Sequence, residues 1–228
     1  MHFSKHNINF LVGIFLFFLV EVSWLLGFFY APVDRIQGEV YRIIFLHVPS
    51  ALTAFLLSFI LLTVSIKSLM QKTYRPMQIG KATAEVGLLF TILTLITGSI
   101  WGRPTWGVYW TWDARLTTTL ILALLYSGYL LLYGAFSPSI ERNRACGILG
   151  ILIAACVPIV YKSVTWWRTL HQPPSLFRAD GNAMSSEIYN TLYFAIITMI
   201  LFSIWLLRTR SENLQLREAI EAKTMQAR

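Results

Sequence analysis

The chain has 228 residues, of which 56% are hydrophobic and only 13% are charged, and its formal net charge at pH 7 is +8. Its mean hydropathy is +0.58. A soluble domain carries about a quarter charged residues, so this composition excludes an ordinary soluble protein. Because the hydrophobic residues also come in long blocks, it indicates a polytopic membrane protein. Basic residues anchor loops at the cytoplasmic lipid surface. Contact with membrane lipid therefore explains the positive charge, and no nucleic-acid partner is needed to account for it.

Six segments are long and apolar enough to cross a bilayer core about 30 Å thick, which takes roughly 20 residues of helix. They are residues 9–31, 43–66, 82–100, 116–136, 145–161 and 188–207. The expected fold is therefore an all-α polytopic membrane protein in which residues 1–228 form a single six-helix transmembrane domain. The fifth segment is the shortest and contains Pro158. The length of the first segment, with Pro32 directly after it, favours a retained helix over a cleaved signal peptide.

The distribution of Lys and Arg predicts how these helices are oriented. Six spans place both termini on one side, and that side carries twelve Lys and Arg residues against seven on the other. Because cytoplasmic loops are the more basic ones, both termini are expected to be cytoplasmic. Residues 211–228 then form a cytoplasmic tail, and their charged composition predicts a solvated helix.

The two cysteines exclude several functions. Cys146 and Cys156 lie on the same predicted helix, and ten residues of helix separate them by roughly 15 Å, which is too far for a disulfide. The sequence contains no CxxC, no CxxCH and no GxxxxGK[ST] motif. The chain by itself is therefore not expected to be a thiol redox protein, a c-type cytochrome or an ATPase.

Most of the unusual residues fall on the outer side of this topology. Its three loops span residues 32–42, 101–115 and 162–187, and the last two hold six of the eight tryptophans. Trp and Tyr gather at membrane interfaces as an aromatic belt, which explains a single tryptophan well. A belt should serve both interfaces, however, and the cytoplasmic loops contain no Trp.

The densest stretch, residues 101–117, reads WGRPTWGVYWTWDARLT. Pro104 suits a helix start, although Gly107 argues against a very regular helix. If a short interfacial helix forms here, four residues spaced i, i+3, i+4 and i+7 share one of its faces. They are Trp106, Tyr109, Trp110 and Asp113.

Two of the four histidines, His47 and His171, lie on the same outer side. A histidine near a membrane interface is often a local hydrogen-bonding residue. Neutral imidazole also ligates heme iron, aromatic rings stack on flat macrocycles, and guanidinium groups bind carboxylates such as the heme propionates. Arginines of the same loops are Arg103, Arg115, Arg168 and Arg178. Together these residues indicate heme binding, with the local hydrogen-bonding role as the alternative.

These stretches resemble a known family. The segment WGRPTWGVYWTWDARLT is similar to the tryptophan-rich signature of the heme-handling proteins of cytochrome c maturation, and within that group the chain resembles the CcmC family. The similarity extends to YRIIFLHVP, which contains His47, and to WWRTLHQ, which contains His171. Cytochrome c synthases share the signature, but they are much larger and have histidines inside the membrane, whereas this chain has no histidine at mid-helix.

The resemblance implies a heme-presenting role at the periplasmic face of the bacterial inner membrane. The cofactor would be heme b, held by the axial ligands His47 and His171 and presented for covalent attachment to the periplasmic heme chaperone CcmE. The chain would act by positioning rather than by covalent chemistry of its own. Further partners implied are the single-helix subunit CcmD and the ABC-type pair CcmA and CcmB. The implied heme platform consists of Trp101, Arg103, Trp106, Tyr109, Trp110, Trp112, Asp113 and Arg115.

Other interpretations remain open from the residues alone. A transporter of another small molecule predicts polar residues around a midplane cavity, and a membrane b-type cytochrome predicts histidines at membrane depth. Asp113 either accepts a hydrogen bond from the chaperone, caps the fourth helix or pairs with Arg115. Glu21 is an acid within an apolar span, so it should have a partner, either on another helix of this chain or on the small subunit.

Overall fold

The computed structural model describes residues 5–71, 76–172 and 184–226. Six helices in these ranges are long and apolar enough to cross a membrane, which confirms the expected all-α six-span fold. They are α1 (Lys5–Leu25), α2 (Ile44–Gln71), α3 (Pro76–Trp106), α4 (Ala114–Ala135), α5 (Ile140–Trp166) and α6 (Ser186–Gln226). Two short helical turns, η1 (Leu26–Tyr30) and η2 (Glu39–Ile43), flank the first outer loop.

Most helices extend beyond the spans predicted from hydropathy. The span predicted at 82–100 is the middle of α3, and the short fifth span at 145–161 is the middle of α5. Hydropathy detects only the part of a helix that contacts lipid, so polar turns at the helix ends are missed. Pro158 lies within α5 without ending it, as transmembrane helices tolerate when neighbouring groups satisfy the freed backbone.

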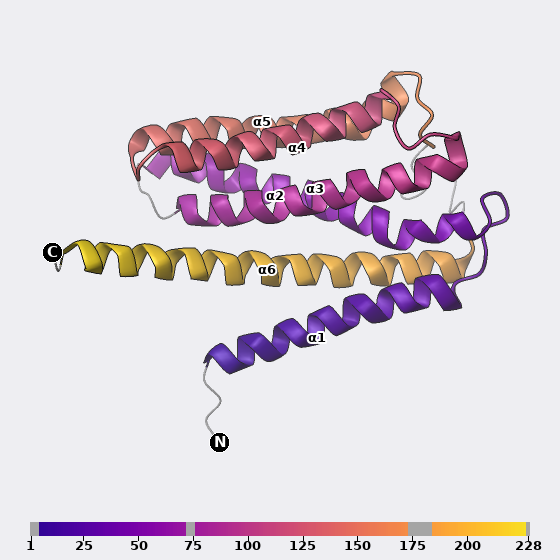
Figure 1. Ribbon diagram of the computed structural model, residues 1–228, viewed down its shortest axis with the longest axis horizontal. Helices are drawn as coiled ribbons and strands as arrows, with labels where there is room; N and C mark the ends of the chain where they lie inside the picture. The colour runs from indigo at the N-terminus through magenta and orange to yellow at the C-terminus, as the bar shows by residue number, and fades with distance from the viewer. Residues whose placement is uncertain (1–4, 72–75, 173–183, 227–228) are drawn as a thin grey trace.

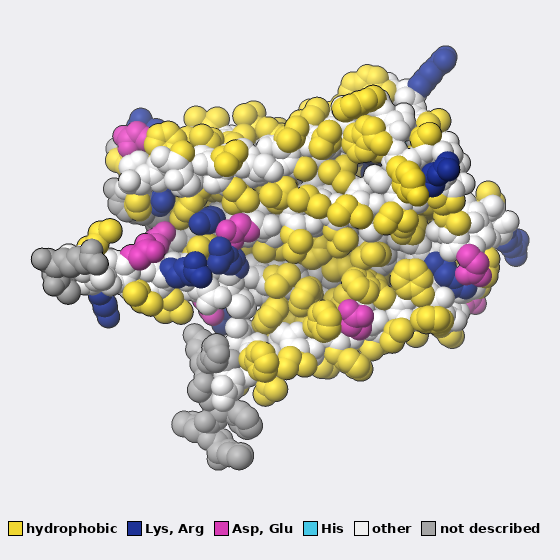
Figure 2. All heavy atoms as spheres, in the orientation of Figure 1, with side chains coloured by type: hydrophobic (Ala, Val, Ile, Leu, Met, Phe, Trp, Pro, Cys, Tyr) yellow, Lys and Arg dark blue, Asp and Glu magenta, His cyan; other side chains and the backbone are white. Residues whose placement is uncertain are grey.

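The helices lie side by side with their axes roughly aligned (Figure 1). α4 and α5 form one edge, α2 and α3 lie next to them, and α6 and then α1 complete the other edge. α1 begins and α6 ends at one end of the bundle, while the loops at residues 31–38 and 107–113 lie at the opposite end, called the site end below. Figure 2 shows apolar side chains covering the middle of this face, with most charged side chains near its two ends.

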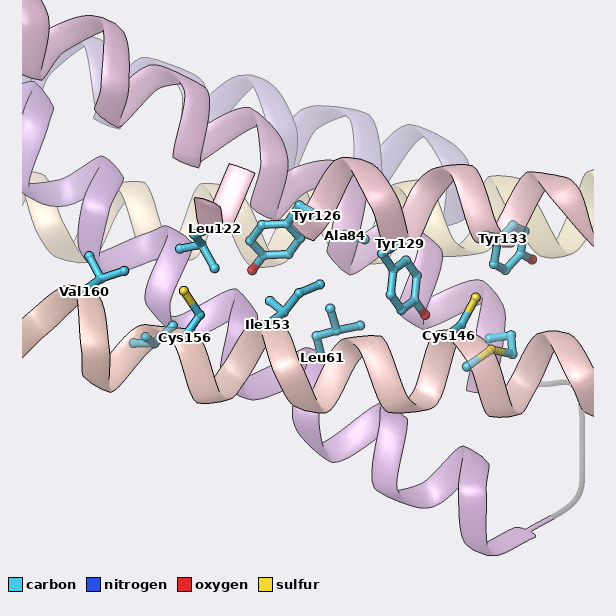
Figure 3. Close-up of a cluster of buried hydrophobic side chains, with 12 residues drawn as sticks. Leu61, Ala84, Leu122, Tyr126, Tyr129, Tyr133, Cys146, Ile153, Cys156 and Val160 are labelled. Atoms are coloured by element: carbon cyan, nitrogen blue, oxygen red, sulfur yellow. The ribbon is translucent and has the colours of Figure 1, made fainter. Parts of the chain in front are cut away.

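Tyrosines of α4 fill the centre of the bundle. Figure 3 shows Tyr126 and Tyr129 pointing from α4 into the cluster that contains Ile153 of α5, and both rings are fully buried. The hydroxyl of Tyr126 lies 2.8 Å from Oγ of Ser58 in α2. Because lipid offers no hydrogen-bond partner, this internal partner fixes α4 against α2 as well as against α5.

The charged stretch at residues 211–228 is not simply solvated. α6 continues through it to Gln226, and Leu214 is buried against the bundle. The carboxylate of Glu218 accepts hydrogen bonds from Gln78 of α3 and from the hydroxyl of Tyr133 of α4. The expectation of a solvated tail is therefore wrong for its first half, because polar side chains of α3 and α4 hold it at the end opposite the site.

The first helix is attached mainly through α6. Trp205 donates its indole N–H to the backbone carbonyl of Asn9 at 3.1 Å, and the rings of Phe17 and Phe202 lie 6.2 Å apart. Glu21 is partly buried, and it forms no hydrogen bond or ion pair with the residues that the structure describes. The sequence left two possible partners for Glu21, another helix of this chain or the small subunit. The described residues provide no partner for Glu21 on another helix.

The close approach of α3 and α4 depends on Gly87. A Cβ atom at this position would lie 2.5 Å from the ring of Tyr126, and overpacking of this kind costs about 1–3 kcal/mol. We expect Gly87→Ala to lower the thermal stability of the purified protein in detergent. Gly134→Ala is the matched control, because nothing lies within 4 Å of a Cβ at that position. Equal unfolding temperatures for the two variants would contradict this packing.

Candidate functional site

A cavity of about 170 Å³ opens at the site end between α2, α3, α4 and α5. Its outer part is lined by five of the residues that the sequence predicted for the site: His47, Trp101, Trp106, Arg115 and His171. Its inner part is formed mainly by apolar side chains and threonines of the four helices. Residues from both halves of the sequence therefore meet at one apolar cavity with a polar mouth.

His47, in the first turn of α2, is held by α3. Its Nδ1 lies 2.9 Å from Oγ1 of Thr97, and that hydroxyl donates its own proton to the carbonyl of Leu93 at 2.7 Å. Nδ1 of His47 must therefore be the donor to Thr97, so the neutral ring keeps its lone pair on Nε2. Gly98 makes room for the ring, since a Cβ there would lie 3.1 Å from Cε1 of His47. The ring of Trp101 lies edge-on, 5.6 Å from that of His47.

His171, in the segment after α5, is arranged in the same way. Its Nδ1 lies 2.9 Å from the backbone carbonyl of Gln172, which can only accept, so Nδ1 carries the proton and Nε2 keeps the lone pair. Burial, followed by the positive charge of Arg115, lowers the pKa of His171 to about 4. The imidazole is therefore neutral at pH 7. Within the described residues, no hydrogen-bond partner occupies Nε2 of either histidine.

Asp113 joins the start of α4 to the segment that carries His171. One carboxylate oxygen accepts the backbone N–H of Arg115 at 2.8 Å, as an N-cap does, and the other accepts the N–H of Leu170 at 2.9 Å. Burial raises the pKa of Asp113, but hydrogen bonds from the hydroxyl of Thr169 and from these two N–H groups outweigh it and lower the pKa. Of the roles left open by the sequence, the structure supports capping, with a second function as a link between two elements.

The two arginines next to the tryptophan-rich stretch differ in environment. Arg115 lines the cavity and forms no ion pair with the described residues. Both carboxylate oxygens of Asp113 instead accept hydrogen bonds from backbone N–H groups. Arg103 is exposed, donates to the carbonyl of Gly107 and lies over the ring of Tyr109. Arg115 is therefore the one of these two that is available to an anionic group in the cavity. Arg168 is exposed, and Arg178 lies outside the described residues.

The tryptophan-rich stretch is divided between a helix and a loop. α3 continues to Trp106 and includes Pro104, which was expected at a helix start. Gly107 has a φ of 82°, in the left-handed region that favours glycine, and it ends the helix. Residues 107–113 are not helical. The short helix considered from the sequence therefore does not form in these residues. The four residues expected to share one of its faces, Trp106, Tyr109, Trp110 and Asp113, do not lie on a common helix face.

The other aromatic residues of the stretch, like Trp166 and Trp167, lie at the site end but do not line the cavity. Trp110 and Trp112 pack edge to face with ring centroids 5.6 Å apart, and the side chain of Trp112 is 75% exposed. Trp166 and Trp167 form a similar pair and are also exposed. The predicted platform is therefore divided: Trp101, Trp106 and Arg115 lie in the cavity wall, Asp113 is buried beside it, and Arg103, Tyr109, Trp110 and Trp112 lie outside it.

Sequence reasoning missed four residues that hold the site together. Thr97 and Gly98 shape the place of His47, and Gln37 links Trp101 to Gln172, the neighbour of His171. Thr97 and Gly98 lie within the last turn of the span predicted at 82–100, without any distinguishing pattern. The only sequence signal for Gln37 is its position in a loop on the same side as both histidines.

The link through Asp113 predicts a pH-dependent loss of stability. In Asp113→Asn the amide keeps one acceptor for Arg115 but cannot accept from the N–H of Leu170, so we expect a loss of about 1–3 kcal/mol at pH 7. The wild-type advantage is present above the ordinary carboxyl pKa of 3.8 and disappears as pH falls through the lowered folded-state pKa.

Thermal unfolding of both proteins in detergent between pH 7 and pH 3 measures this difference. Glu39→Gln is the control, because the side chain of Glu39 is 69% exposed and exposed ion pairs contribute little. A stability difference that does not shrink in acid would show that the carboxylate of Asp113 is not the link.

Comparison with known proteins extends the similarity over almost the whole chain. The family model described as "CcmC: Heme exporter protein C" matches residues 1–226. The heme exporter protein C of Haemophilus influenzae is 37% identical over 199 residues, covering 87% of this chain and 80% of that protein. The protein of the same name from Bradyrhizobium diazoefficiens is 40% identical over 201 residues, with coverages of 83% and 75%. The heme exporter protein C of Escherichia coli is 36% identical over 196 residues, with coverages of 86% and 79%. Together with six apolar helices and two histidines on one cavity, these matches show that the chain is a multi-pass membrane protein of the heme exporter protein C (CcmC) family.

Proposed function

We propose that this chain holds heme b at the periplasmic face of the bacterial inner membrane and presents it for covalent attachment to the heme chaperone CcmE during c-type cytochrome biogenesis. The observation that carries the proposal is the pair of histidines on one cavity. Each uses Nδ1 as a donor and keeps Nε2 without a partner among the described residues. Two neutral imidazoles of this kind suit the two axial positions of a heme iron.

The size of the cavity supports presentation rather than enclosure. An engineered cavity of about 150 Å³ accommodates one benzene molecule, so about 170 Å³ takes one edge of a porphyrin and not the whole ring. The rest of the ring would lie at the mouth, near the exposed aromatic side chains. Heme would supply the vinyl group at which the partner is attached. This chain would hold the heme in the position and orientation that the attachment needs.

Arg115 completes the set of groups that suit this cargo. The apolar wall formed by Trp101 and Trp106 suits the face of the macrocycle, and the unpaired guanidinium of Arg115 suits a propionate carboxylate. Arg115 is half-buried and forms no ion pair among the described residues, so an anionic group bound there would give its guanidinium a partner. The exposed Arg103, which is engaged with Gly107 and Tyr109, is assigned no contact with the cargo.

The proposal also assigns sides and partners. Both termini are placed in the cytoplasm, and the site end faces the periplasm. The exposed rings of Trp112, Trp166 and Trp167 are the surface offered to CcmE. Glu21 of α1, which has no partner among the described residues, is offered to the single-helix subunit CcmD. The ABC-type pair CcmA and CcmB acts after attachment and is assigned no surface on this chain.

The structure favours neither of the other functions considered. A transporter of a polar molecule needs free polar groups in its cavity, but the hydroxyls of Thr91, Thr94 and Thr119 donate to carbonyls of their own helices. A membrane b-type cytochrome holds heme between helices at membrane depth, whereas His47 lies in the first turn of its helix and His171 in a loop.

Replacing either proposed ligand tests the function directly. His47→Ala and His171→Ala should each shift the Soret band and lower heme per protein more than about tenfold, since even the hydrogen-bond partners of metal ligands are worth about 10- to 100-fold. Added imidazole should restore part of the heme and of the spectrum. His6→Ala, at the opposite end of the bundle, is the control. Wild-type heme content and spectrum in His171→Ala would refute the two-histidine site.

The role of Arg115 is tested by removing the charge of the arginine and, separately, the charges of the heme propionates. Arg115→Gln should lower retention of heme by about 10- to 100-fold, the range for a hydrogen bond between charged groups. Retention of heme dimethyl ester, which lacks the propionate charges, should change little. Arg103→Gln should leave the binding of both compounds near the wild-type level. An equal loss of heme and of its ester in Arg115→Gln would mean that Arg115 does not bind the propionates.

A further inference from the structure

The first outer loop, residues 31–38, reaches the site through one side chain. Oε1 of Gln37 accepts the indole N–H of Trp101 at 2.8 Å, and Nε2 of Gln37 donates to the side-chain oxygen of Gln172 at 2.9 Å. Trp101 and Gln172 both line the cavity. Gln37 thus connects the end of α3 to the residue that follows His171.

The direction of these two bonds is fixed by chemistry. An indole N–H can only donate, so the oxygen of the Gln37 amide must face Trp101 and its nitrogen must face Gln172. A flipped amide would place a donor against a donor and an acceptor against an acceptor. The amide of Gln37 is therefore a directional bridge, and a side chain that replaces it must offer an acceptor to Trp101 and a polar atom to the amide of Gln172.

Gln172 connects the bridge through Gln37 to His171. Its backbone carbonyl accepts from Nδ1 of His171 while its side chain is held by Gln37. On the other side of His171, the N–H of Leu170 is held by Asp113. Among the described residues, side-chain hydrogen bonds from Asp113 and Gln37 thus hold the segment at 167–172 on both sides of the imidazole.

The loop is built so that Gln37 keeps its place. Oδ1 of Asp34 accepts the backbone N–H groups of Ile36 at 3.0 Å and of Gln37 at 2.8 Å, which closes a tight turn. At the base of the loop, Arg42 donates to the carbonyl of Ala31 at 2.7 Å. Ile36 at the tip is 93% exposed, so apolar burial does not hold this turn. Its position depends on hydrogen bonds, and the bridge through Gln37 is the one that reaches the cavity.

We propose that Gln37 is a positioning residue for His171. By bridging Trp101 and Gln172 it holds the segment at 167–172 over the cavity and sets the direction of the His171 ring. This inference deepens the proposed function and rests on it, because the benefit of a fixed ring is ligation of heme. The bridge itself is a property of the heme-free protein, so it is testable without any heme.

The heme-free test is a distance measurement. Spin labels at Val33→Cys and Arg168→Cys, both exposed positions, report the loop and the His171 segment, with Cys146 and Cys156 replaced by Ala. We expect a narrow distance distribution in the parent protein and a broader one in Gln37→Leu. Ile36→Ala, in the same turn, should leave it narrow. A distribution that stays narrow in Gln37→Leu overturns the bridge, whatever the protein does with heme.

The heme test separates positioning from general damage to the fold. Gln37→Leu should lower heme retention about tenfold, the worth of roughly two neutral hydrogen bonds, and shift the Soret band toward that of His171→Ala. Gln172→Leu, which removes only the bond to Gln37, should show a smaller loss with the same spectral shift, and the double variant should lose little more than Gln37→Leu. In Gln37→Glu the amide of Gln172 can turn and donate to the new carboxylate, so heme retention and spectrum should recover.

The outcomes distinguish the inference from the proposed function. Loss of heme in Gln37→Leu with a wild-type spectrum in the remainder, or no recovery in Gln37→Glu, overturns positioning of His171. If the wild-type protein binds no heme, the proposed function fails, and the role of Gln37 toward heme fails with it. The distance measurement then still decides whether the bridge exists.

Discussion

The carboxylate of Asp113 is the contact on which the candidate site depends. It accepts N–H groups from two elements, the start of α4 and the segment after α5, whose donor Leu170 lies 57 residues from Asp113 in sequence. Hydrogen bonds to a buried charge are stronger than neutral ones, and they are directional, so they fix where the segment crosses α4. α4 is itself fixed by Tyr126, which packs on Gly87 and bonds to Ser58. Through Asp113, the position of His171 thus depends on the packing of the helix core.

The two histidines are held by different means. His47 stands on a transmembrane helix and bonds to a neighbouring helix, where backbone polar groups cannot exchange partners with water. His171 stands in a segment that Asp113 and Gln37 tie down through a few hydrogen bonds, and local opening of such a segment needs less free energy than opening of a helix.

Hydropathy was enough to predict the six spans, because the bilayer imposes an apolar length on each helix locally. The resulting topology placed His47 and His171 on one side, and both line the same cavity. Hydropathy and residue type were not enough to separate Arg115 from Arg103, since both are basic residues beside the same tryptophans and only tertiary contacts distinguish them. Thr97 and Gln37 are uncharged residues whose partners lie 50 or more residues away in sequence. The charged tail was misjudged for a related reason, since Glu218 finds its partners on α3 and α4.

The tryptophans at the site end differ in environment, so an interfacial aromatic belt and a heme platform are compatible interpretations of the same stretch. A belt tryptophan keeps its indole N–H in the wet interface, which describes Trp112 with its 75% exposed side chain. Trp101 is different, because its ring is buried between Tyr41 and His47 and its N–H is given to Gln37. Burying that N–H is favourable only with an acceptor in place, so the ring of Trp101 and the loop that carries Gln37 require each other. One sequence motif thus supplies the wall of a cavity at its start and an exposed aromatic edge at its end, with Gly107 as the point where the chain leaves the helix and makes the change.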